Sequence, residues 1–525
     1  MGLSMILLAC IYAVALFVIS IHVVLNKRRR DASSSLPPLP PGPWGLPLIG
    51  NTFYFIGVLR HSAHRVLARL NQTYGPIASF RVGMSTSPFV VLSSPAAARE
   101  ALAGNDLAVS ARWVPDGARA MAHNEGSVLF LPSSNPLWKQ HRVSISAHFS
   151  GRSIEMTRQI RDRHARRLAE AVRAAACRRS GGQPVAVGEA VFGALVNVVS
   201  NIIFSRDLVD VVELMSGQPQ QQLLYYKGNM IAIFEALATP NISDIFPFLA
   251  RLDPFGLRRR VSRNLAEFYK MFDENVVQSR LASGGGANHG DLLDLVLARH
   301  AKSQITRAEI SKLFTELFVA GTDTSMNTVE WAMARLLRNP DKLAKLRAEL
   351  AASVGSKEFV EESDLVGKLP YLHAVVKEIL RLHPPLALLP REVAAEEGVS
   401  LGGFGMPKGT RMLVNLWAVG RDPTAWPEAE EFVPERFLGD DNKTPVVNFR
   451  DPNFTYIPFG AGRKVCPGMD MAARLVPLLL ASLLHKVEWK LPDGMAPEDV
   501  DLREHGTAVL RPATPLRAIP VMSTV

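Results

Sequence analysis

The fold follows from one stretch of the sequence, Phe459-Gly460-Ala461-Gly462-Arg463-Lys464-Val465-Cys466-Pro467-Gly468. It places one cysteine in a glycine-rich turn, directly before an apolar helical pattern from Met469 to His485. A cysteine just before a helix lies at the positive end of the helix dipole. The neighbouring cations Arg463 and Lys464 act in the same sense, so we expect the thiol of Cys466 to ionise easily.

A thiolate in such a loop suits a metal-bearing cofactor. Gly460 and Gly462 let the backbone pass close to a large flat ligand. The thiolate of Cys466 then fits the fifth coordination position of haem iron, where it pushes electron density toward bound oxygen. The alternative is a buried structural cysteine after a surface turn, since most free cysteines behave as small hydrophobic side chains.

The loop resembles the haem-binding signature of the cytochrome P-450 monooxygenases. Every fixed position of that signature matches, namely Phe459, Gly460, Gly462, Arg463, Cys466 and Gly468. The resemblance implies a mainly α fold with small β-sheets, the haem-thiolate fold of that superfamily, and haem b (iron protoporphyrin IX) as cofactor. It makes Cys466 the metal ligand, Phe459 a cofactor-binding residue and Arg463 a partner of a haem propionate.

Composition indicates a large folded chain in a reducing compartment. Of its residues 47% are hydrophobic and 21% charged, which allows a substantial core. Three cysteines are too few for a disulfide scaffold, so we expect the folded part to be cytosolic. The net charge of +10 favours either plain solubility or attraction to anionic lipids or an acidic protein partner. The sequence has no run of interleaved basic and aromatic residues of the kind that would indicate nucleic acid binding.

The N-terminal sequence predicts a membrane anchor. Leu3 to Leu25 is almost wholly apolar and approaches the roughly 20 residues that span a bilayer. The cations Lys27 to Arg30 follow it and favour a cytosolic C-terminal part. We expect a single transmembrane signal-anchor helix at 1–26, a basic and proline-rich hinge at 27–50 and the catalytic domain at 51–525. The alternative is a cleaved secretory signal. Resemblance to microsomal members implies the endoplasmic reticulum membrane.

A long helix is predicted to carry the oxygen-side residues. Thr306 to Glu309 forms a capping box, and the helical pattern runs to about Arg338 before Asn339-Pro340 ends it. We expect Gly321 to disturb this helix and open it over a ligand. Asp323 and Thr324 match the acid–alcohol pair of the superfamily, and the resemblance makes them catalytic residues that deliver protons. The alternative is an ordinary buried helix with a glycine for close packing.

Other motifs match the parts that hold the cofactor. Trp138 and Arg142 lie four apart, on one face of a predicted helix, and the family's use of this spacing implies contact with a haem propionate. Arg391 stands where the family places another propionate-binding arginine. A structural ion network is implied by the Glu-x-x-Arg motif and a later Pro-Glu-Arg-Phe segment, at Glu378, Arg381 and Arg436.

Two further segments carry local predictions. Ala78 to Val82 and Phe89 to Leu92 predict a β-hairpin around Gly83. Phe246 to Phe255 is aromatic and punctuated by proline. Three expectations are open for this segment: a lid, a segment that dips into the membrane surface, or a plain loop packed on the core.

Three stretches resemble the branch of plant microsomal members that contains geraniol hydroxylases and related terpenoid oxidases; they begin at Thr328, Arg474 and Ser482. The resemblance implies hydroxylation of a small apolar terpenoid, with O2 and with electrons from a separate NADPH-cytochrome reductase, because no Gly-rich nucleotide-binding fingerprint is evident. NADPH therefore acts indirectly. Two alternatives remain: a haem enzyme that rearranges a peroxide, and a haem-thiolate sensor without turnover.

Overall fold

The structure is a computed structural model that describes residues 36–523, apart from 47–48, 84–86, 152, 179–183, 216–220, 283–288, 440–447 and 507. The predicted signal-anchor at 1–26 and the first part of the predicted hinge lie outside the described residues. Leu36 to Leu46 is irregular, as its prolines require.

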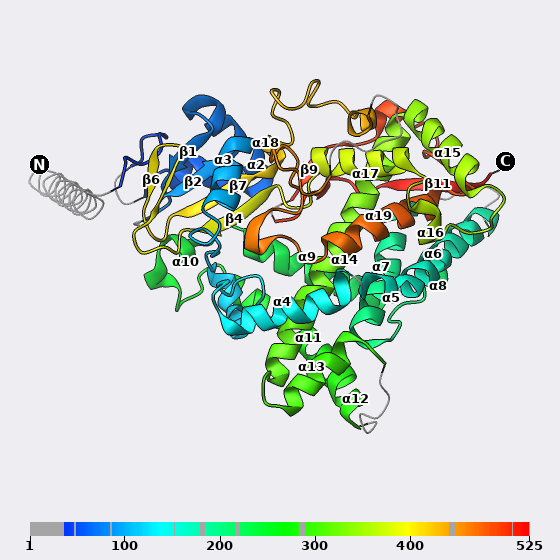
Figure 1. Ribbon diagram of the computed structural model, residues 1–525, viewed down its shortest axis with the longest axis horizontal. Helices are drawn as coiled ribbons and strands as arrows, with labels where there is room; N and C mark the ends of the chain where they lie inside the picture. Colours follow the sequence, from blue (N-terminus) through cyan, green and yellow to red (C-terminus); the bar gives the residue numbers. More distant parts are fainter. Residues whose placement is uncertain are drawn as a thin grey trace, which may run out of the picture.

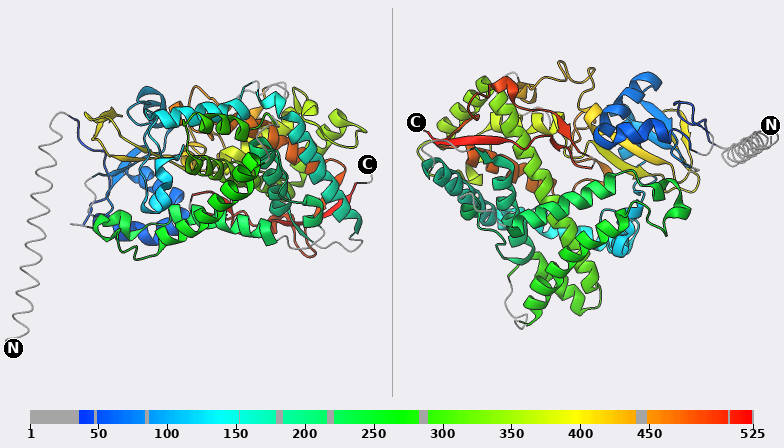
Figure 2. Two further views of the ribbon diagram at one scale, coloured as in Figure 1. Left: turned by 90° about the horizontal axis from the view of Figure 1, so that it is seen from below. Right: turned by 180° about the vertical axis from the view of Figure 1, so that it is seen from behind.

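Helices form most of the molecule. One group of strands lies at the left end of Figure 1, and the strand drawn in red lies at the opposite end. The two further views show the same division (Figure 2). The helices are α2 (Thr52–Tyr74), α3 (Pro95–Arg99), α4 (Pro136–Phe149), α5 (Ser153–Met156), α6 (Arg158–Arg178), α7 (Val187–Phe204), α8 (Val211–Met215), α9 (Gln221–Ala238), α10 (Ile242–Ile245), α11 (Leu257–Phe272), α12 (Ser279–Ala282), α13 (Leu292–Ala301), α14 (Arg307–Arg338), α15 (Pro340–Val354), α16 (Glu362–Leu365), α17 (Pro370–Leu382), α18 (Leu416–Val419) and α19 (Met469–Leu484). This confirms the mainly α fold predicted from the sequence.

The strands form small sheets, also as predicted. They are β1 (Ile77–Phe80), β2 (Phe89–Leu92), β3 (Val185–Ala186), β4 (Leu388–Glu392), β5 (Val399–Leu401), β6 (Phe404–Met406), β7 (Arg411–Asn415), β8 (Val487–Lys490), β9 (Glu504–His505), β10 (Arg511–Pro512) and β11 (Arg517–Met522). The largest sheet has the order β1-β2-β7-β4, and the others are β3-β11-β8, β5-β6 and β9-β10. The predicted hairpin is confirmed, because β1 and β2 pair antiparallel, with Ile77 opposite Leu92.

α14 is the central helix, and it packs against α7, α11, α17 and α19. Its start is the predicted capping box: the Thr306 hydroxyl accepts from the Glu309 N–H, and the Glu309 carboxylate accepts from the Thr306 N–H. Its end is at Arg338, directly before Asn339-Pro340. The expectation that Gly321 disturbs this helix is wrong, since α14 is continuous. A Cβ at Gly321 would lie 3.2 Å from Val199, so this glycine instead lets α7 pack closely.

One apolar helix needs separate mention. Within the described part of the chain, α7 is the one helix long and apolar enough to cross a membrane, but 94% of it is buried. It contacts α14 and α6 in the main hydrophobic core. A position inside the fold accounts for its composition, because a helix that is apolar all round is typical of a buried core helix as well as of a membrane span.

Candidate active site

Cys466 lies between a 3-10 turn, Gly462–Lys464, and the start of α19. Its N–H donates to Phe459 O at 3.0 Å and closes the loop. Gly462 has a φ of +71°, and a Cβ there would lie 2.2 Å from Asp106 Oδ1, so this position requires glycine. Gly460 lines the cavity described below, whereas Gly462 faces Asp106.

The expectation that the Cys466 thiol ionises easily, helped by Arg463 and Lys464, is wrong. Burial raises the pKa of the Cys466 thiol, although the Gly468 N–H and the charges of Arg142 and Arg112 oppose that shift. Arg463 instead pairs with Asp106 at 3.3 Å, and Lys464 donates to Leu131 O at 2.6 Å. The protein alone therefore keeps the thiol protonated, and binding of a metal has to supply the ionisation, as it does for coordinated thiols generally.

One face of α14 stands over this loop. Glu316, Ala320 and Thr324 recur every four residues, so they share a face. All three line the same cavity as Cys466. The Thr324 hydroxyl donates to Ala320 O at 2.7 Å, so its own proton is held by the helix while its lone pairs remain to accept a hydrogen bond.

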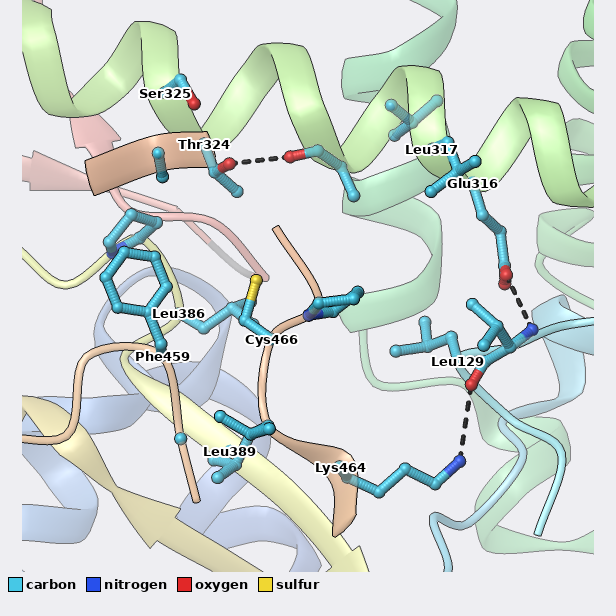
Figure 3. Close-up of a pocket in the computed structure, with 18 of the residues that line it drawn as sticks. Leu129, Glu316, Leu317, Thr324, Ser325, Leu386, Leu389, Phe459, Lys464 and Cys466 are labelled. Carbon is cyan, nitrogen blue, oxygen red and sulfur yellow. Dashed lines mark hydrogen bonds between the residues drawn. The ribbon is translucent and has the colours of Figure 1, made fainter. Parts of the chain in front are cut away.

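Between α14 and the cysteine loop is a cavity of about 300 Å³. Figure 3 shows Thr324 on the helix side, with Cys466 and Phe459 on the opposite side. Most of its wall is apolar, with Ile233 and Leu237 from α9, Val376 and Leu380 from α17, and Leu389 from β4. An apolar cavity of this size with a few polar groups is typical of a small-molecule site.

Cations gather at one edge of this cavity. Arg112, Arg142 and Lys464 line the cavity. Arg391 lies close enough to Arg112 for the two positive charges to repel each other. Burial, together with Arg112 and Arg391, lowers the pKa of Lys464 to about 7. Burial and Arg112 lower the pKa of Arg391 to about 9. Such crowding of positive charge indicates that the site is built to receive an anion.

Unsatisfied donors support the same conclusion. Arg112 Nε and Arg391 Nη2 are buried and have no hydrogen-bond partner among the described residues. Buried donors of this kind normally have partners, so a ligand oxygen is expected there. Haem fits this arrangement: its two carboxylates match the cation cluster, its ring matches the apolar walls, and Cys466 is positioned for its iron.

Most of the residues predicted to bind the cofactor line the same cavity. Trp138 and Arg142 both lie on α4 and line the cavity. Trp138 Nε1 donates to Val128 O at 3.1 Å, and Arg142 Nη1 donates to Val465 O at 3.0 Å. Phe459 also lines the cavity and packs edge-on against Phe449, with ring centroids 5.0 Å apart.

Arg391 and Arg463 behave differently from each other. Arg391 is 2% exposed and lies behind the cavity wall with a free donor, as described above. Arg463 has a half-exposed side chain, pairs with Asp106, and is not among the residues that line the cavity. Arg463 was predicted to contact a haem propionate. Lys464 and Arg112 line the cavity instead.

The two predicted catalytic residues face different ways. Thr324 lines the cavity, but Asp323 does not. Asp323 is fully buried, and its Oδ2 accepts from Arg511 Nη2 at 3.0 Å. Its Oδ1 has no hydrogen-bond partner among the described residues. Direct contact between the Asp323 carboxylate and a ligand in the cavity is therefore absent from this arrangement of the described residues.

The predicted ion network is confirmed. Arg381 Nε and Nη2 each donate to Glu378 at 2.7 Å, and Arg436 Nε donates to Glu378 at 3.2 Å. The Arg381 guanidinium also donates to the carbonyls of Gly420 and Ala429. Because every charge has a partner, the network holds α17 against the segment that leads to the cysteine loop.

Sequence reasoning missed Arg112, Glu316 and His123, all of which line the cavity. Glu316 carries a readable signal, since it lies two turns before Thr324 on the same helix face. Arg112 and His123 lie in irregular chain and a 3-10 turn, where no periodic pattern indicates which way a side chain points.

Comparison with known proteins agrees with this geometry. Residues 40–519 match the family described as Cytochrome P450. The chain is 40% identical to oryzalexin E synthase from Oryza sativa subsp. japonica, over 95% of each chain. It is 42% identical to ent-cassadiene C11-alpha-hydroxylase 1 from the same organism, over 97% of each chain. It is 40% identical to geraniol 8-hydroxylase from Catharanthus roseus, over 92% of this chain and 94% of that protein.

The fold and the cysteine loop thus define a haem-thiolate oxidoreductase. The chain belongs to the cytochrome P450 family. It is an oxygenating enzyme whose relatives include plant terpenoid hydroxylases, and haem iron is the cofactor that the family implies.

Proposed function

We propose that this enzyme hydroxylates a small apolar terpenoid, using O2 and electrons from an NADPH-dependent reductase. The observation that carries the proposal is the apolar cavity bounded by Cys466 on one side and Thr324 on the other. Haem, when bound, supplies the oxygen chemistry itself. Relatives named for oxidation of geraniol and ent-cassadiene support the terpenoid class.

The chain's own residues take separate roles in this proposal. Arg112, Arg142, Arg391 and Lys464 hold the cofactor carboxylates, and Cys466 holds its iron. Thr324 Oγ1 accepts a hydrogen bond from a proton donor in the cavity, because its own proton is engaged by Ala320 O. Asp323 acts as a positioning residue that fixes this part of α14 through Arg511. The apolar wall excludes water and orients the substrate.

The test is substrate-dependent NADPH consumption by the purified chain with a plant NADPH-cytochrome reductase. Hydroxylated product that requires the reductase supports the proposal. Conversion of a hydroperoxide without reductase would support the peroxide-rearranging alternative, and ligand binding without any turnover would support the sensor. The hydroxyl of Thr324 at the cavity disfavours both alternatives, since neither needs a proton to be handled there.

We also infer attachment to the endoplasmic reticulum membrane, with 1–26 as a single anchor, 27–50 as hinge and 51–525 on the cytosolic side. Exposed apolar side chains near the hinge support this: Trp44 is 83% exposed, Phe248 70% and Leu252 71%. Gly83 lies between the segment that follows Trp44 and the segment that precedes Phe248. Its N–H donates to Ile49 O, and a Cβ at Gly83 would meet Ile245. We propose that these side chains together form an apolar face directed at the lipid surface.

We expect the chain lacking residues 1–26 to keep part of its membrane binding through this face. Replacing both Phe248 and Leu252 with serine should lower the fraction that sediments with vesicles of mixed neutral and anionic lipid, because apolar area is lost from the contact. Met156→Ser is the matched control, since Met156 is 74% exposed but lies on α5, away from α10. Equal loss in the control, or no loss in the double variant, would contradict membrane contact through this face.

A further inference from the structure

A polar cluster interrupts the apolar wall of the cavity beside α14. Glu316 and His123 both line the cavity, and both side chains are about nine-tenths buried. Glu316 lies two helical turns before Thr324, which places it about 12 Å from Thr324 along the helix axis. Figure 3 shows it on the helix that carries Thr324, reaching toward the segment of Leu129.

Most hydrogen-bonding capacity in this cluster is already assigned. Glu316 Oε2 accepts from the Val128 N–H at 2.8 Å, and Oε1 accepts from the Ser127 hydroxyl. His123 Nδ1 is 2.6 Å from the Tyr269 hydroxyl. The contact between His123 Nε2 and Glu316 Oε1 is longer, at 3.4 Å, which is beyond the usual range for an N–H···O bond.

Charge and protonation follow from these contacts. Burial alone raises the pKa of Glu316, but the nearby His123 side chain and the hydrogen bonds from Ser127 and Val128 outweigh it and hold the pKa below its usual value, so Glu316 is an anion at neutral pH. Burial, with a smaller contribution from Glu316, raises the pKa of Tyr269, so its hydroxyl keeps its proton. Tyr269 can therefore donate to His123 Nδ1, which leaves Nε2 carrying a proton that faces Glu316.

We propose that this pair recognises an alcohol: a substrate hydroxyl accepts from His123 Nε2 and donates to Glu316 Oε1. A hydroxyl is both donor and acceptor, so it satisfies both partners, whereas an ether or ketone satisfies one and a hydrocarbon neither. The inference rests on the proposed function and narrows its substrate class to a terpenoid that already carries a hydroxyl group.

The distance along α14 also predicts where oxidation occurs. With its hydroxyl held at Glu316, an extended terpene alcohol presents the opposite, hydrocarbon end to Thr324 and Cys466. The carbon attacked should therefore be remote from the existing hydroxyl. The substrate is then the product of an earlier step that leaves an alcohol, such as hydrolysis of a prenyl diphosphate or a previous hydroxylation.

The competing explanation is that Glu316 merely ties the Ser127–Val128 segment to α14. Three variants separate the two. His123→Phe removes the Nε2 donor and leaves both segment contacts of Glu316 in place. Glu316→Gln removes the charge and keeps an acceptor for the Val128 N–H. Ser127→Ala is the matched control, because it weakens the tie to the segment and leaves His123 and the carboxylate facing the cavity.

The experiment titrates the haem-loaded full chain with geraniol, farnesol and geranylgeraniol, each against the hydrocarbon that lacks its hydroxyl, and follows the substrate-induced change in the haem spectrum. We expect at least one alcohol to bind about 10- to 100-fold more tightly than its hydrocarbon, the usual worth of a hydrogen bond to a charged group. His123→Phe and Glu316→Gln should bring that ratio close to one by weakening the alcohol alone. Ser127→Ala should leave the ratio unchanged.

Absence of alcohol preference at every chain length would overturn the inference. So would a ratio that survives in His123→Phe, or equal weakening of both ligands in all three variants. The proposed function is tested separately, by product formation with reductase and NADPH. An enzyme that prefers alcohols but forms no product would contradict the proposed function and leave the binding inference standing.

Discussion

Cys466→Ala and Cys466→His should both lose the reduced carbonyl absorption typical of thiolate-bound haem, and product formation should fall below detection. Cys466 borders the cavity, and the loop around it is closed by the bond from its N–H to Phe459 O. Without a thiolate, the electron donation that favours O–O cleavage is lost. The apolar walls and the cation cluster remain in both variants, so some haem should still bind.

The matched control is Cys177→Ala, because Cys177 is an exposed free cysteine on α6. This control should keep the carbonyl spectrum and the turnover of the unmodified chain. Retention of the thiolate-type spectrum in either Cys466 variant would remove the basis of the ligand assignment.

Thr324→Ala should bind haem and substrate normally, continue to consume NADPH, and yield far less product with a matching rise in hydrogen peroxide. The Thr324 hydroxyl lines the cavity, and its lone pairs are free to hold a proton donor there. General acid–base assistance is typically worth about 100- to 10,000-fold, so product per NADPH should fall plainly. Reconstituted turnover that follows NADPH, peroxide and product together measures it.

Thr322→Ala is the control for this experiment. Thr322 also donates its hydroxyl back to the helix, to Phe318 O at 2.7 Å, but it is fully buried and does not line the cavity. It should leave coupling unchanged. Wild-type coupling in Thr324→Ala would mean that proton handling lies elsewhere, unless a substrate hydroxyl replaces the missing one. A hydrocarbon substrate without a hydroxyl removes that exception.

Asp323→Asn should slow product formation more than it changes substrate affinity. Asp323 does not reach the cavity, and its contact with Arg511 fixes the neighbouring turn of α14. Loss of that charge pair therefore acts on Thr324 indirectly, and the spectral binding constant for substrate should stay close to that of the unmodified chain. A large loss of substrate affinity would instead place Asp323 in the binding site.

The sequence predicted those parts of the fold and site that depend on local chemistry. The start of α14 follows from the Thr306 capping box and its end from Asn339-Pro340, because both signals act within one helical turn. Glu378 and Arg381 face each other because residues three apart on a helix share a face. Thr324, which the motif singles out, lines the cavity.

Features that join distant segments could not be read in the same way. Arg463 pairs with Asp106, while Arg112 lines the cavity, and both of these residues lie in a segment far from Arg463 in the sequence. The acidity expected for Cys466 failed because desolvation, which depends on the whole surrounding fold, outweighs the nearby charges. Gly321 serves the packing of α7, a contact that its own sequence context does not reveal.

The most direct test of the account is turnover of the reductase-reconstituted enzyme under isotopically labelled O2 in unlabelled water, with the product analysed by mass spectrometry. The account predicts that each new hydroxyl group carries the label, and that product formation requires both NADPH and the thiolate of Cys466. Unlabelled product, or product formed from a hydroperoxide in the absence of O2 and reductase, would contradict it.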